Sequence, residues 1–90
     1  MTATINDVIL LGVVYTDVYA ATGIVLGTPL VIQNKSATNL VYLQIAATAP
    51  PASDRDGFII YPGKSVFVDN ATEGLYAFGT GRLHVAQDVA

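Results

Sequence analysis

The sequence contains no cysteine and no tryptophan, and it has one histidine and one methionine. The absence of cysteine excludes a disulfide framework, an iron–sulfur cluster, a zinc–thiolate site and a thiol nucleophile. Charged residues are scarce as well, because Asp, Glu, Lys and Arg make up only 12% of the chain. Stability must therefore come from the packing of apolar side chains.

Positive charge is rare and comes late in the chain. The four Lys and Arg residues begin at Lys35, and the net charge is −3. No positive surface is then available to follow a phosphate backbone, which excludes nucleic acid as a partner. The apolar stretch Val8 to Tyr15 is far shorter than the roughly 20 residues of a membrane span. Because no Lys or Arg precedes it, it does not resemble a secretion signal either. We expect no membrane partner and a location in the cytoplasm or in a particle assembled there.

Apolar residues are abundant in this short chain. They make up 52% of its 90 residues, and the mean hydropathy is +0.51. Ninety residues form one domain, 1–90, in which we interpret residues 1–7 as a flexible N-terminal arm. A domain this small has too much surface to bury so many apolar side chains by itself, which predicts an oligomer or a subunit of a larger assembly. The alternative is a dense core with some of the twelve alanines scattered over the surface.

The residue types favour β-structure. Val, Ile, Thr, Tyr and Phe number 35, whereas Glu, Lys, Gln, Arg and Met number nine. Turn residues recur about every eight to twelve positions, which is typical of short strands in a sandwich or barrel. The sequence therefore predicts an all-β fold, a compact β-sandwich or barrel of about seven short antiparallel strands with almost no helix.

Individual segments can be assigned within this fold. We expect a strand over Val8 to Val14, bulged at Gly12, that continues into Asp17 to Ala20. The continuous apolar run Leu40 to Ile45 predicts a strand covered on both faces. Adjacent prolines in Ala46 to Gly57 predict one long loop.

Two hairpins are expected in the second half of the chain. In the first, Phe58 to Tyr61 pairs with Ser65 to Asp69 around a type II turn at Pro62-Gly63. In the second, Gly74 to Phe78 leads through Gly79, Thr80 and Gly81 into Arg82 to Gln87.

No group of residues indicates catalysis or metal binding. The sole histidine, His84, lies in mid-strand opposite the face of its apolar neighbours, and none of the serines Ser36, Ser53 and Ser65 lies in a nucleophile motif. The segment Asp54 to Gly57 resembles the start of a calcium loop, but its glycine comes too early and no bidentate Glu follows. We predict no catalytic, cofactor-binding or metal-binding residue, and no enzyme.

Exposed tyrosines can stack on sugar rings, so a carbohydrate-binding module is an alternative. Tyr15 and Tyr19 are four residues apart and would share one face of a strand. We favour tyrosines that pack at a subunit boundary, because tryptophan, the common sugar platform, is absent.

Several segments resemble, in their order and spacing, a family of small structural proteins of tailed bacteriophages. The likeness runs from Tyr15 to Gln87, and the residues that carry it are Tyr19-Ala20-Ala21-Thr22-Gly23-Ile24, Gly27 to Ser36, Val41-Tyr42-Leu43, Ala49-Pro50, Asp56-Gly57 and Pro62-Gly63. The resemblance implies an all-β module on the head or in the tail of a virion. The chain departs from the family at Leu75-Tyr76-Ala77, where relatives carry a tryptophan.

Both lines of argument lead to an acidic, cysteine-free β domain that is rich in apolar residues and functions through an interface. Together with the resemblance, this makes a virion structural subunit our first hypothesis. It would be a head decoration or cement subunit, or a head-fibre base, that forms a homotrimer and binds the major capsid protein or tail proteins. A tail-associated adaptor or fibre anchor is the alternative. The apolar runs predict an interface formed by Val8, Leu10, Val13, Tyr15, Tyr19, Leu40, Tyr42, Leu43 and Ile45.

Overall fold

The structure is a computed structural model that describes residues 7–69 and 71–87. The predicted arm therefore lies outside the described residues except for Asp7. Within the described ranges the chain forms one short helix and seven antiparallel strands, which confirms the all-β class. These elements are β1 (Val8–Leu11), β2 (Thr16–Asp17), α1 (Val18–Thr22), β3 (Leu30–Asn34), β4 (Val41–Ile45), β5 (Phe58–Ile60), β6 (Ser65–Val68) and β7 (Leu75–Gln87).

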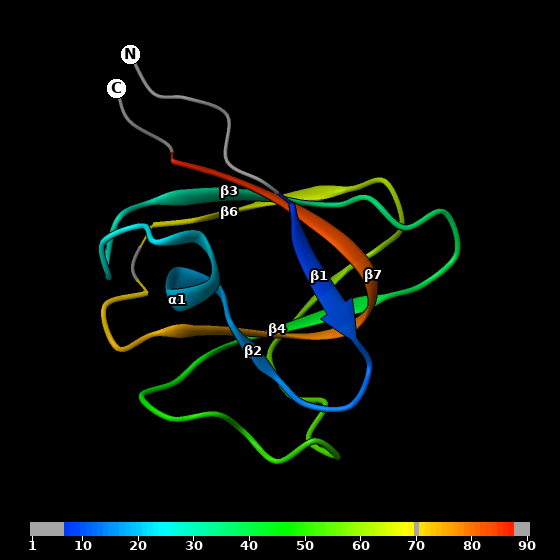
Figure 1. Ribbon diagram of the computed structural model, residues 1–90, viewed down its shortest axis with the longest axis horizontal. Helices are drawn as coiled ribbons and strands as arrows, with labels where there is room; N and C mark the ends of the chain where they lie inside the picture. Colours follow the sequence, from blue (N-terminus) through cyan, green and yellow to red (C-terminus); the bar gives the residue numbers. More distant parts are fainter. Residues whose placement is uncertain (1–6, 70, 88–90) are drawn as a thin grey trace.

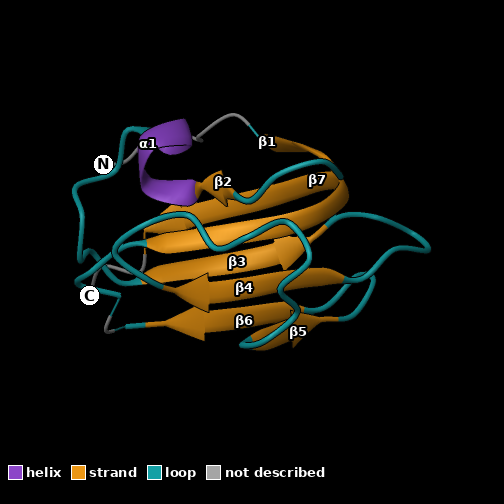
Figure 2. Cartoon of the chain, turned by 90° about the horizontal axis from the view of Figure 1, so that it is seen from below, coloured by secondary structure: helices purple, strands orange, loops and turns teal. Residues whose placement is uncertain are grey.

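The 13-residue strand β7 organises the sheet. Along one edge, its first half pairs with β4 and its second half with β3. Along the other edge the same halves pair with β2 and β1. Strands β5 and β6 lie outside β4 and β3, so neighbouring strands follow the order β5-β4-β7 in one half of the sheet and β6-β3-β7 in the other. Figure 2 shows β5 and β6 at one border of the sheet and β1 and β2, beside α1, at the other.

The sheet bends over on itself to make two layers. One layer contains β1, β7, β3 and β6, the other contains β2, β7, β4 and β5, and β7 runs through both (Figure 1). Strands that change layers at bends are the corners of orthogonal β-packing. The result is the predicted sandwich or barrel-like globule.

The second expected hairpin is wrong, because β7 continues without a turn through Gly79, Thr80 and Gly81. These glycines permit close approach and an unusual backbone. A Cβ on Gly79 would lie 2.9 Å from the carbonyl oxygen of Leu40, and Gly81 has a φ of +121°. Glycine is needed here for a bend inside a strand. Glycines in a sequence do not show whether they form such a bend or a turn between two strands.

The first expected hairpin is also wrong, although its turn exists. Lys64 N donates to Tyr61 O at 3.0 Å and Gly63 has a φ of +75°. However, β5 pairs with β4 and β6 pairs with β3. Gly63 N donates to Asn34 O, and Asn34 N donates to Lys64 O, both at 2.9 Å. This pattern makes Gly63 a bulge within one bent edge segment, β5–β6.

The strand expected over Asp17 to Ala20 is instead mostly helix α1. Asp17 caps the first turn, since its Oδ1 accepts a hydrogen bond from Ala20 N at 3.1 Å. Gly23 ends the helix in the left-handed conformation and donates to Tyr19 O at 2.9 Å. The two caps specify a single helical turn between them. The helix lies at the open end between the two layers (Figure 1).

The core fills the space between the layers and the helix. β4 lies between β5 and β7 with Val41 and Leu43 buried on its inner face. The continuous apolar run predicted cover on both faces, and on the outer face Tyr42 and Gln44 are half-buried. The predicted loop, residues 46–57, contains no strand. The core residues are Val8, Leu10, Val18, Tyr19, Ile24, Leu30, Ile32, Val41, Leu43, Ile60, Val68, Ala71, Leu75, Ala77, Leu83 and Val85.

Candidate interaction surfaces

The nine residues predicted for an interface fall into three groups. Val13 and Leu40 are exposed, and Tyr42 and Ile45 are half-buried. The remaining five are buried within the chain itself, and they are Val8, Leu10, Tyr15, Tyr19 and Leu43. An apolar run in the sequence does not separate these groups, because burial depends on which layer of the sheet each side chain faces.

One set of exposed apolar side chains lies on the border formed by β1 and β2. We call it the β1–β2 ridge: Ile9, Leu11, Val13 and Val14, which are 57%, 73%, 63% and 61% exposed. Ile9 and Leu11 alternate with the buried residues of β1, so they face outward. The register against β7 shifts by two residues between β1 and β2. Leu11 pairs with Thr80 and Thr16 pairs with Ala77, so residues 12–15 stand opposite only residues 78 and 79 of β7. The extra residues include Gly12, at a φ of +76°, and the exposed Val13 and Val14.

A second set lies on the opposite border. We call it the β5–β6 ridge: Phe58, Ile59, Tyr61 and Phe67, which are between 41% and 59% exposed. Phe67 lies opposite Val31 on the outer face, and Val31 lies opposite Ala86. This gives an apolar row across three strands. A signal for this ridge is the unbroken apolar run Phe58-Ile59-Ile60-Tyr61, because a strand with one face in water would alternate apolar with polar residues.

The outer face of the second layer is covered by the long loop. Tyr15 packs on Phe78 with ring centroids 5.2 Å apart, and Gln44 Nε2 donates to the Tyr15 hydroxyl. That hydroxyl in turn donates to Asp54 O. The guanidinium of Arg55 lies 4.0 Å from the Phe78 ring centroid and 5.3 Å from that of Tyr42. Sequence analysis missed this small aromatic cluster, because the contacts join segments far apart in the chain.

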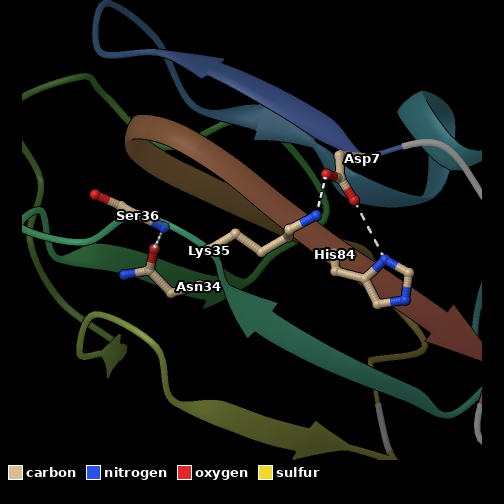
Figure 3. A network of polar contacts seen from close by, with 5 residues as sticks. All are labelled: Asp7, Asn34, Lys35, Ser36 and His84. Carbon is tan, nitrogen blue, oxygen red and sulfur yellow. Dashed lines mark hydrogen bonds and ion pairs between the residues drawn. The ribbon is translucent and has the colours of Figure 1, made fainter.

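Asp7 forms a polar cluster on the outer face of the first layer (Figure 3). Its Oδ2 lies 2.7 Å from Lys35 Nζ and its Oδ1 lies 3.2 Å from His84 Nδ1. The hydrogen bond from Lys35 lowers the pKa of Asp7, partial burial opposes this, and His84 adds to the lowering. His84 faces outward as predicted. The cluster links the start of β1 to β3 and β7.

The residues beside this cluster do not assemble a catalytic group. Ser65 lies opposite Gln33, and Gln33 lies opposite His84, so the serine is two strands, about 10 Å, from the histidine. The hydroxyl of Ser36 accepts hydrogen bonds from Thr38 N and Asn39 N and shapes a turn. Among the described residues no three His, Asp or Glu side chains come together as metal ligands.

Three further observations bear on function. No helix in the described part of the chain is long and apolar enough to cross a membrane. Tyr15 and Tyr19 are each 5% exposed, so their rings offer no exposed platform for a sugar.

Comparisons with protein-family models, curated proteins and solved structures gave no match. The two ridges are therefore the structural features on which a function can be based.

Proposed function

We propose that the protein is a structural subunit of a bacteriophage virion, a head decoration or cement subunit or a head-fibre base. It associates with copies of itself and docks on capsid proteins. The observation that carries the proposal is the pair of exposed apolar ridges on opposite borders of a domain whose core is already filled. The order and spacing of residues between Tyr15 and Gln87 support the virion as the site of assembly.

Physical chemistry favours covering both ridges. Burying apolar surface lowers the free energy by about 25 cal/mol for each Å² removed from water. Large contiguous apolar patches mark interaction sites. A stable protein interface buries about 800 Å² on each partner. Two borders can serve two contacts, one with a second copy and one with a capsid protein.

Such a subunit acts mechanically. Each individual contact is modest, but many copies bound across the boundaries between capsid subunits act together through avidity. The shared strand β7 joins both layers of the fold, so a load applied at one border is carried through backbone hydrogen bonds to the other.

Self-association is tested by the solution mass of the purified chain, measured by light scattering at micromolar concentration. We expect a stable oligomer; the trimer predicted from the sequence would have a mass near 28 kDa, three times 9.4 kDa. The variants Leu11→Lys and Phe67→Lys, one on each ridge, test which ridge serves self-association, with Thr38→Lys as an exposed polar control. A monomer at all concentrations would contradict self-association.

The virion assignment is tested by quantitative mass spectrometry of purified particles of the phage that encodes the chain. Abundance comparable to that of the major capsid protein would support decoration of the head. A few copies per particle would favour the tail adaptor instead. Absence of the chain from particles would overturn the virion proposal.

A further inference from the structure

The outer edge of β6 is open. β6 is the last strand in the sheet order, and within residues 7–69 and 71–87 no strand pairs with its outer side. The hydrogen bonds of Asn34 with Gly63 and Lys64 fix which backbone groups point outward. Pairing alternates along an antiparallel strand, so Val66 and Val68 bond to β3. The N–H and C=O groups of Ser65 and Phe67 therefore point away from the sheet.

No side chain within β6 protects its edge, and the Gly63 bulge lies before the strand begins. Natural sheets guard their edges with charged residues or prolines within the edge strand. β6, with the sequence Ser-Val-Phe-Val, has neither. The nearest charged residues flank the strand: Lys64 precedes it and Asp69 follows it, and both are exposed. An antiparallel copy of the same strand would bring each positive end beside a negative end, whereas a parallel copy would bring like charges together.

We propose that β6 pairs antiparallel with β6 of a second copy of this chain about a two-fold axis. The inference rests on the proposed self-association and names its site. The two-fold axis passes beside Phe67, so Phe67 lies opposite Phe67 of the partner subunit. Opposed residues point to the same face of a continuous sheet, so the two rings lie side by side. Ser65 then lies opposite Asp69 of the partner subunit. This register uses all the outward backbone groups of Ser65, Phe67 and Asp69.

The pairing also extends the apolar row on the outer face. In one chain the row runs from Ala86 through Val31 to Phe67, which is 57% exposed. The two-fold axis joins it end to end with the same row of the partner. The result is one eight-stranded layer with order β1-β7-β3-β6 repeated in reverse, and the exposed Phe67 rings are covered by each other.

Oxidative cross-linking tests the register in the full chain, which has no cysteine of its own. Directly opposed residues in a hydrogen-bonded pair have Cα atoms about 5.5 Å apart, within the range for a disulfide. We expect Phe67→Cys to form a covalent dimer in high yield. The control Ser65→Cys lies two residues away on the same outer face and should form almost none. No cross-link in Phe67→Cys, or equal yields in both, would overturn the pairing.

Solution mass gives the second test. A two-fold pairing gives two chains and not the three predicted from the sequence, so we expect a mass near 19 kDa, twice 9.4 kDa, for the wild-type chain. Phe67→Lys places like charges opposite each other and should be a monomer, whereas Leu11→Lys on the other border should remain a dimer. A wild-type monomer, or a trimer insensitive to Phe67→Lys, would overturn the β6 pairing. The virion proposal is decided separately, by the presence of the chain in purified particles.

Discussion

Asn34 joins three segments at the bend of the sheet. It is the one buried polar residue among the described residues, and its side chain is fully satisfied. Its Nδ2 donates to Asn39 O at 2.8 Å and to Ile60 O at 3.0 Å, and its Oδ1 accepts from Ser36 N at 2.9 Å. Because its backbone also bonds to the Gly63 bulge, Asn34 fixes where β3 ends and where β5 meets β6.

We predict that Asn34→Ala lowers the free energy of unfolding by about 2–3 kcal/mol, because buried backbone groups lose their partners. Urea unfolding followed by circular dichroism measures the change. Gln33→Ala, at a half-buried amide on the outer face, is the matched control and should change stability by less than about 1 kcal/mol. Equal effects of the two substitutions would refute the bridging role of Asn34.

Asp7 gives the molecule a pH dependence. Its pKa lies below the ordinary value of 3.8, chiefly because of the hydrogen bond from Lys35. A lowered pKa means that the ionised carboxylate stabilises the fold above the ordinary pKa, and that this stabilisation is lost as the pH falls through the lowered value. The effect is small, since the Lys35 side chain is 45% exposed and water screens the ion pair.

We therefore expect the wild-type chain to lose more stability between about pH 5 and pH 2 than Asp7→Asn does. Urea unfolding at a series of pH values measures the difference. Glu73→Gln serves as the control, because Glu73 is exposed and forms no ion pair among the described residues. Parallel pH profiles for Asp7→Asn and the wild type would contradict the assignment.

At the scale of elements, composition and turn spacing were sufficient for the fold class, for β4 and for the long loop. They were not sufficient for pairing. The turn residues at Pro62-Gly63 and Gly79-Thr80-Gly81 predict hairpins locally, yet both lie at the bend of the sheet, where β3 and β4 offer partners on either side. The helix was missed because five residues show no helical period, and the capping residues Asp17 and Gly23 were the only signal.

The exposure of apolar side chains could be predicted only in part, because it also depends on strand pairing. Excess apolar composition correctly indicated exposed apolar side chains, and Val13 and Leu40 are among them. Alternate residues of a strand point inward and outward, so exposure within a run depends on which residues face the core. It also depends on the long loop, which covers Tyr42 and Phe78. Neither can be derived from one segment of sequence.

The long loop should contribute to stability through Arg55. Its guanidinium lies over the rings of Phe78 and Tyr42, and such a contact is worth about 0.5–1 kcal/mol at an exposed site. We predict that Arg55→Ala lowers the free energy of unfolding by about 1 kcal/mol. The exposed Arg82→Ala, which removes the same charge from β7, should have less than half of this effect. Chemical denaturation of both variants at one ionic strength provides the comparison.

The whole molecule combines a closed core with two open borders. Strands β1, β2, β3 and β4 all pair with β7, and β5 and β6 pair with β4 and β3. Because β7 is continuous through both layers, the layers cannot separate unless β7 itself is broken. The apolar ridges lie at the ends of this arrangement, where no strand of the described residues follows. The core therefore specifies the fold, and the two borders are where the proposed assembly would take place.

The proposed pairing of β6 with a second copy would make stability depend on protein concentration. Association of folded chains stabilises them by mass action, because the unfolded chain lacks the β6 edge. We predict that the Tm of the wild-type chain rises by several degrees when the concentration increases about a hundredfold. The Tm of Phe67→Lys should stay constant, while Leu11→Lys should follow the wild type. Scanning calorimetry over this range measures all three. A wild-type Tm that does not change with concentration would mean that the folded chain does not associate with itself.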